Sequence, residues 1–142
     1  MSRQPMPVPD HSPRQSVARL RVRYAETDKM GVVYYANYLV WFEVGRCEWL
    51  RAAGLTYAGL EAEGIILPVV GAHCEYRQPA RYDDEIEVLA CGRLLSPVRV
   101  RFDYEVRRAG ADVLACGWTE HAAVDPNGRP RRLPLQVRRL FP

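Results

Sequence analysis

The chain has 142 residues, of which 48% are apolar and 26% are charged. This composition is typical of one globular domain and excludes a disordered chain. The formal net charge of +3 is too small to indicate nucleic-acid binding by itself.

The four cysteines are far apart, and no C-x-x-C motif is present. The spacing therefore predicts free, buried thiols and no metal site. Residues 1–16 are rich in proline, serine and glutamine and lack an apolar core, which favours a flexible tail before one domain at 17–142. The longest apolar run, around 32–42, is too short to cross a membrane. We expect a cytoplasmic protein without a membrane span or a cofactor.

The first half of the chain predicts one strand followed by a long helix. Residues 17–24 alternate apolar and arginine side chains, a period typical of a half-buried strand. Residues 36–53 lose this alternation, are apolar over more than one face, and precede Gly54, which is a common helix stop. A short helix and loop are expected at 54–64.

Further strands are predicted at 65–77, 83–95, 96–108 and 113–125, the last two forming a hairpin. The C-terminal residues form a basic tail with a short helix. The fold class is therefore α+β, with an antiparallel five-stranded sheet wrapped around one central helix. Such a sheet leaves an edge and a face uncovered, which predicts a homodimer and, beyond it, a dimer of dimers.

Four segments in order resemble a known family. They are R-Y-A-E-T-D-K-M-G-V-V-Y-Y-A-N-Y (23–38), F-E-x-x-R (42–46), E-Y-R-Q-P-A-R-Y-D-D (75–84) and V-D-P-N-G-R-P-R-R-L-P (124–134). They are similar to hotdog-fold acyl-CoA thioesterases of the 4-hydroxybenzoyl-CoA type, which include the Tol-Pal-linked bacterial branch. The likeness spans roughly residues 18–134. It implies hydrolysis of an acyl-CoA to a carboxylic acid and CoA.

Asp28 and Tyr35 are the catalytic residues that this resemblance implies. Asp28 attacks the thioester carbonyl directly or deprotonates a water, and the sequence leaves both routes open. Asp28 as a simple turn or helix cap is the structural alternative. Gly31 is expected to allow close approach of the substrate. Tyr35 would offer its main-chain N–H to the oxyanion at the start of the helix; the Tol-Pal-linked enzymes carry histidine at this position.

Other predicted substrate contacts are less local. Tyr24 either faces inward from the first strand or lines the site. Arg99 or Arg101, and Arg131 or Arg132, are candidates for CoA phosphates across the dimer, since arginine binds phosphate through paired hydrogen bonds. Ser96 is a candidate near the thioester.

Several polar residues are predicted to be structural. Glu26 is expected to be a solvated turn carboxylate, Asn37 a capping group, and Glu43 with Arg46 a helix ion pair. His73 and His121 are expected to pack on strands.

Two other functions share this fold. A hydratase or dehydratase would need a histidine in the segment 24–38, which has none. A non-catalytic acyl-CoA-binding protein would not require Asp28.

Overall fold

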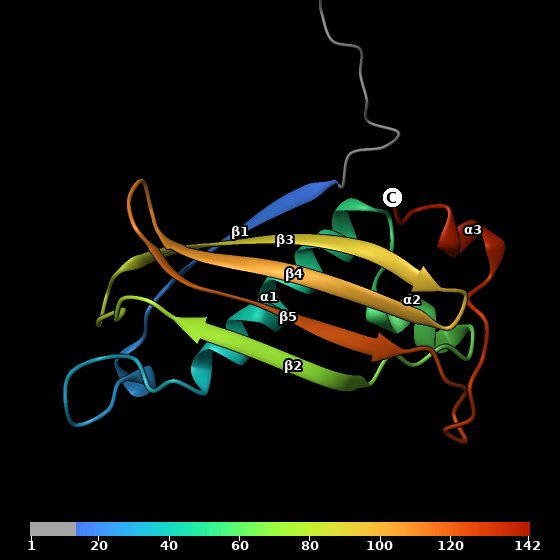
Figure 1. The fold of residues 1–142 in the computed structure, drawn as a ribbon, viewed down its shortest axis with the longest axis horizontal. Helices are drawn as coiled ribbons and strands as arrows, with labels where there is room; N and C mark the ends of the chain where they lie inside the picture. The colour runs from blue at the N-terminus through green and yellow to red at the C-terminus, as the bar shows by residue number, and fades with distance from the viewer. Residues whose placement is uncertain (1–13) are drawn as a thin grey trace, which may run out of the picture.

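The computed structural model describes residues 14–142, and its centre is one antiparallel sheet with the order β1-β3-β4-β5-β2. Figure 1 shows the five strands side by side. Their bounds are Gln15–Arg21 (β1), Val69–Tyr76 (β2), Glu85–Ser96 (β3), Arg99–Arg108 (β4) and Val113–Ala122 (β5). The predicted α+β architecture is confirmed.

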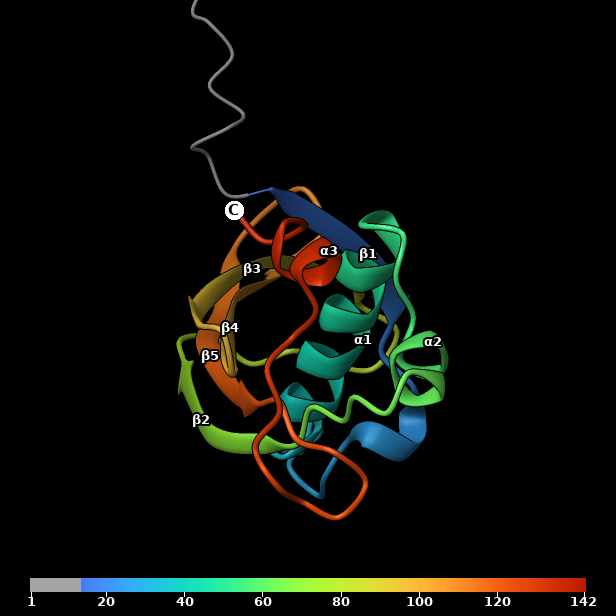
Figure 2. The same cartoon turned by 90° about the vertical axis from the view of Figure 1, so that its right-hand side faces the viewer.

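The long helix α1 (Asn37–Ala52) lies in the hollow of the curved sheet, as Figure 2 shows. It packs mainly against β1 and β3. Gly45 permits this approach, because a Cβ atom there would lie 2.7 Å from a methyl carbon of Val88 on β3. The remaining helices are short: η1 (Tyr24–Glu26), α2 (Tyr57–Ala62) and α3 (Leu135–Arg138).

Aromatic side chains of α1 fill the space between helix and sheet. Trp41, Phe42 and Trp49 are fully buried. Phe42 stacks on Tyr104 of β4 with ring centroids 4.2 Å apart, and Trp49 meets Phe102 edge to face at 5.4 Å. Each such buried ring contributes about 2–3 kcal/mol through the hydrophobic effect alone.

The strand predictions differ from the structure mainly at their ends. β1 begins at Gln15, so the last two residues assigned to the tail belong to the sheet, and residues 1–13 lie outside the described part. β1 ends at Arg21, and the chain then turns through η1. β2 begins only at Val69, after Pro68, which lacks an N–H for the ladder.

One side of α1 is open, although the sequence predicts a helix buried around most of its surface. Leu39, Val40 and Val44 are all exposed. They lie on the side of the hollow where β2 forms the edge of the sheet. Leu39 and Val40 line a pocket there together with Val69 of β2. This apolar face of α1 is therefore not covered by the rest of residues 14–142.

The cysteines Cys47, Cys74, Cys91 and Cys116 are free, as expected, but half-buried rather than fully buried. Burial raises the pKa of the Cys47, Cys74 and Cys91 thiols. Within residues 14–142, His, Cys, Asp and Glu side chains form no group suited to a metal ion. No helix in the same range is long and apolar enough to cross a membrane.

Candidate active site

Asp28 lies in a tight loop between η1 and α1, and the loop holds its carboxylate by one oxygen. Oδ1 accepts hydrogen bonds from the N–H of Met30 at 2.9 Å and of Val32 at 3.4 Å. The Asp28 N–H in turn donates to the Val32 carbonyl at 2.9 Å. No hydrogen bond to Oδ2 occurs within residues 14–142. The carboxylate is therefore oriented, with one oxygen left for another partner.

Gly31 serves this loop through its backbone rather than through lack of bulk. Its φ is +82°, a conformation that residues with a side chain rarely adopt. An added Cβ would meet no atom within 4 Å. The structure thus gives Gly31 a role in the turn, and its predicted role in the approach of the substrate stays a prediction.

The loop folds back on the residues that lead into α1. Thr27 pairs with Val33 in an antiparallel bridge, and the Tyr34 N–H donates to the Glu26 carbonyl at 2.8 Å. The N–H groups of Tyr35 and Ala36, at the start of the helix, have no acceptor within the described residues. Asp28 and two free main-chain donors thus belong to one compact segment.

A pocket of about 260 Å³ opens beside these donors. Val33, Tyr35 and Tyr38 form one wall, and the end of β2 with the residues after it forms the other. Tyr76, Arg77, Gln78 and Pro79 supply that second wall. In Figure 1 the Asp28 loop lies at the arrowhead end of β2, where these residues are. The prediction from sequence missed Tyr38 and Tyr76, whose only signal was their place in two of the family-like segments.

Glu26 is buried, with 5% of its surface exposed, which overturns its prediction as a solvated carboxylate. Its side chain accepts hydrogen bonds from the Arg23 N–H at 2.8 Å and from the indole N–H of Trp41 at 3.2 Å. The Asn37 side chain donates to the Glu26 carbonyl at 3.0 Å, so Asn37 ties η1 to the start of α1. Glu26 therefore fixes the loop that carries Asp28 against the helix.

We expect Glu26→Ala to lower the free energy of unfolding by about 2 kcal/mol, because the buried indole N–H of Trp41 and the partly buried N–H of Arg23 lose their acceptor. Urea titration followed by circular dichroism measures this change. Glu61→Ala, at an exposed position of α2, is the matched control and should stay within about 0.5 kcal/mol of the parent. Equal stabilities of the two variants would contradict the structural role of Glu26.

Tyr24 is not an inward strand residue. It lies in η1 with 78% of its surface exposed, and its ring meets Tyr82 edge to face at 5.6 Å. Lining of the site by Tyr24 stays a prediction.

β3 ends at Ser96, β4 begins at Arg99, and the Arg131 N–H donates to the Ala123 carbonyl just after β5. In Figure 1 this end of the sheet lies opposite the loop between η1 and α1. Ser96 ends β3, and its Oγ accepts from the Val98 N–H at 3.2 Å. Arg99 lies 3.5 Å from a Glu120 carboxylate oxygen, and Arg131 donates to the Glu63 carbonyl. One chain therefore does not bring them to the Asp28 loop.

The predicted Glu43–Arg46 ion pair is wrong. Glu43 is exposed, whereas Arg46 is 8% exposed and donates to two phenol oxygens. The distances are 2.7 Å to Tyr57 and 3.1 Å to Tyr104. Burial by itself would lower the pKa of Arg46, but the Tyr104 and Tyr57 oxygens outweigh it and raise the pKa. Arg46 is a buried cation that joins α1 to the sheet.

The hydrogen bonds continue from Tyr104 into the core. Its hydroxyl lies 2.6 Å from Thr119 Oγ1, which lies 2.9 Å from Nε2 of His121. Nδ1 of His121 must carry the proton, because it faces the Leu67 carbonyl at 2.9 Å. His121 is fully buried, as its packing prediction requires. His73 instead lies on the outer face and stacks on Trp118 at 5.9 Å.

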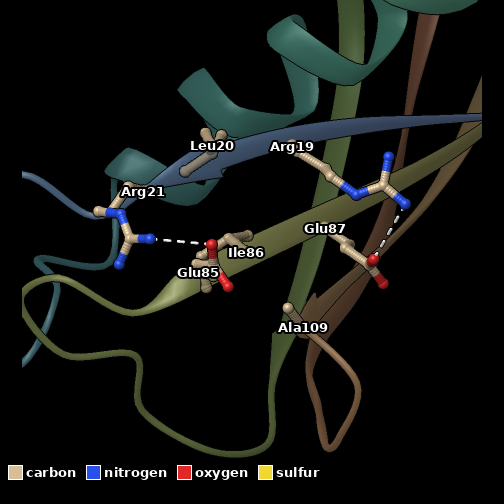
Figure 3. Close-up of a pocket in the computed structure, with 7 residues that line it drawn as sticks. All are labelled: Arg19, Leu20, Arg21, Glu85, Ile86, Glu87 and Ala109. Atoms are coloured by element: carbon tan, nitrogen blue, oxygen red, sulfur yellow. Dashed lines mark hydrogen bonds and ion pairs between the residues drawn. The ribbon is translucent and has the colours of Figure 1, made fainter.

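A second pocket, of about 290 Å³, lies along β1 and β3 (Figure 3). Arg21 is 2.8 Å from Glu85, and Arg19 is 3.4 Å from Glu87. The two arginines of this pocket, both on β1, are therefore paired with carboxylates of the neighbouring strand β3. Such exposed pairs stabilise little. The Asp28 loop, which lies next to the free main-chain N–H groups of Tyr35 and Ala36, remains the candidate site.

Comparisons with known proteins agree with this geometry. Residues 22–138 match the family described as the thioesterase-like superfamily. The acyl-CoA thioester hydrolase YbgC of Escherichia coli is 32% identical over 83% of this chain and 89% of its own. The prediction that this chain is an enzyme related to acyl-CoA thioesterases is therefore confirmed.

Solved structures show the same fold. A 1,4-dihydroxy-2-naphthoyl-CoA thioesterase from Synechocystis is 27% identical over 90% of this chain and 96% of its own, with a TM-score of 0.83. A DHNA-CoA thioesterase from Staphylococcus aureus is 34% identical over 84% of this chain and 80% of its own, with a TM-score of 0.80. The chain thus belongs to the thioesterase-like superfamily and is an enzyme with the hotdog fold.

Proposed function

We propose that this enzyme hydrolyses an acyl-CoA thioester in the cytoplasm, with Asp28 as its catalytic carboxylate. The observation that carries the proposal is the compact segment in which an oriented Asp28 carboxylate and the free N–H groups of Tyr35 and Ala36 occur together. Thioester hydrolysis needs both a nucleophile or base and fixed donors for the charge that develops on oxygen. The pocket lined by Tyr35 and Tyr38 is the place for the acyl carbonyl.

Two routes use the same groups. In the first, an Asp28 oxygen bonds to the carbonyl carbon, the C–S bond breaks, CoA leaves as a thiolate, and water hydrolyses the mixed anhydride. In the second, Asp28 takes a proton from a water that attacks the carbon, and the C–S bond then breaks to release CoA as a thiolate and leave the carboxylic acid. In both, negative charge on the carbonyl oxygen is stabilised by main-chain N–H donors at the helix start, where the helix dipole adds a favourable field.

Release of free CoA from a panel of short-chain, long-chain and aromatic acyl-CoAs tests the activity. We expect turnover of at least one class. Binding across the panel without any CoA release would support the non-catalytic alternative instead. The finer assignment to the 4-hydroxybenzoyl-CoA type is supported by Tyr35, because the Tol-Pal-linked branch commonly carries histidine there. The same panel tests that assignment through the preferred acyl group.

We further propose that two copies pair along β2. Support comes from the position of β2 at the edge of the sheet and from exposed apolar residues nearby. These are Leu39, Val40 and Val44 of α1 with Val69 and Val70 of β2. Two-fold pairing covers the same patch on both copies. The CoA contacts predicted for Ser96, Arg99 and Arg131 would then be made to CoA that is bound at the Asp28 loop of another subunit. We also expect two such dimers to associate into a dimer of dimers.

Sedimentation equilibrium should give at least twice the chain mass of 16.2 kDa. Val70→Glu should shift the population toward the monomer, because it places a charge in the apolar patch. Val17→Glu, on the opposite edge strand and also exposed, is the matched control. A monomeric parent chain at micromolar concentration would contradict the pairing.

A further inference from the structure

Tyr76 makes one directed contact with the candidate site. It is the last residue of β2, and its hydroxyl donates to the Tyr35 carbonyl at 3.1 Å. Its ring meets Tyr38 edge to face with centroids 5.0 Å apart and Tyr35 at 6.2 Å. Tyr38 is itself fixed, because its hydroxyl accepts from the Ala80 N–H at 3.3 Å. The Tyr76 phenol is thus aimed at the Tyr35 carbonyl, which also accepts from the Tyr38 N–H at 3.2 Å. Tyr76 is the second donor to this carbonyl and the one that comes from the sheet.

That carbonyl shares a planar peptide unit with the Ala36 N–H, and the two groups point in opposite directions. A donor that fixes the carbonyl therefore also fixes the direction of the N–H. Hydrogen bonding at the carbonyl further polarises the unit and strengthens the N–H as a donor. The Ala36 N–H has no acceptor within residues 14–142, so this strengthened donor is free.

We propose that Tyr76 is a positioning residue for the oxyanion site. Together with the Tyr38 N–H, its hydroxyl holds the Tyr35–Ala36 peptide unit so that the Ala36 N–H joins the Tyr35 N–H in binding the oxygen of the substrate carbonyl. The inference rests on the proposed thioester hydrolysis and adds to it a second main-chain donor and a side chain on the edge strand that controls it.

The phenol acts as a donor and not as a base. Partial burial raises the pKa of Tyr76, and the neighbouring Cys74 thiol adds to the increase. The hydroxyl therefore keeps its proton at neutral pH and continues to donate to the Tyr35 carbonyl. The pH-rate profiles of the parent and of a Tyr76 variant should therefore show the same ionisations.

Tyr76→Phe is the test, because it keeps the ring between Tyr35 and Tyr38 and removes only the hydroxyl. We expect kcat to fall about tenfold with KM within about twofold, a smaller loss than the 10²–10³ caused by removing an oxyanion donor itself. Tyr82→Phe is the matched control and should leave kcat unchanged. The Tyr82 ring is also exposed and paired with another tyrosine, but its hydroxyl makes no hydrogen bond within the described residues.

An NMR measurement separates the possible failures. The Tyr35 carbonyl carbon and the Ala36 amide nitrogen should both shift in Tyr76→Phe, since the carbonyl loses a donor, and thermal stability should change little. A shift without a fall in kcat would overturn the positioning role, and the absence of a shift would overturn the contact itself. An inactive parent enzyme that still shows the shift would instead refute the proposed hydrolysis and, with it, a catalytic role for this contact.

Discussion

Asp28→Asn should lower kcat by at least about a hundredfold, the scale expected for loss of a principal catalytic group. The amide can still accept hydrogen bonds from Met30 and Val32 through its oxygen, so the loop should keep its shape. It can neither attack a carbonyl carbon effectively nor take a proton from water. Steady-state CoA release with the best acyl-CoA of the panel measures the effect.

Asp125 provides a matched control within the same chain. Its Oδ1 accepts from the N–H groups two and four residues later, Asn127 at 2.9 Å and Arg129 at 3.0 Å, as Asp28 does in its own loop. Asp125→Asn should leave kcat unchanged. If both variants kept full turnover, Asp28 would be a turn residue only, and the catalytic assignment would fail.

His121 should make the protein less stable in mild acid. Burial, and to a lesser extent the charge of Arg46, lowers the pKa of its imidazole from 6.5 to about 4, against the opposing bond to Leu67. Between these values the unfolded chain binds a proton that the folded chain excludes. The stability associated with neutral His121 is therefore complete above pH 6.5 and declines as the pH falls toward 4. The full difference is about 3 kcal/mol, from 1.36 kcal/mol per pKa unit.

Melting temperatures of the parent and of His121→Gln, recorded between pH 7.5 and about 4, test this expectation. Glutamine can still bond to Thr119 and Leu67 but cannot titrate, so its curve should fall less steeply. His73→Gln removes a histidine on the exposed face of β2 and should keep the slope of the parent. Parallel curves for the parent and His121→Gln would contradict the buried, neutral imidazole.

The fold was largely predictable because its elements show clear periods. The alternation in 96–108 and 113–125 predicts a hairpin, and the structure has β4 and β5 there. The helix over 36–53 is observed as Asn37–Ala52. Periodicity does not reveal how far a helix is covered, however. The exposed Leu39 and Val40 of α1 would be buried only if another surface were present.

The site was less predictable because its contacts join distant parts of the chain. The sequence does not distinguish a buried carboxylate in a turn from a solvated one. Only the fold places the Trp41 indole N–H against Glu26. Arg46 lies three residues after Glu43, yet the sheet offers it the Tyr104 phenol from another element. Tyr76 contacts Tyr35 across 41 residues. The hydrogen bonds that Asp28 itself makes span at most four residues, so this turn was the predictable part.

The strand order also limits when the pocket can be assembled. Within residues 14–142, β2 pairs with β5 alone, and Tyr76 lies opposite Ala115 in that ladder. The second wall of the pocket therefore depends on a strand that follows it by almost forty positions, and closing so long a loop is slower than forming the β3–β4 and β4–β5 hairpins. A nascent chain that has exposed Asp28 and all of α1 still lacks its pocket until β5 emerges. A chain that ends before β5 therefore lacks the strand against which this wall of the pocket is held.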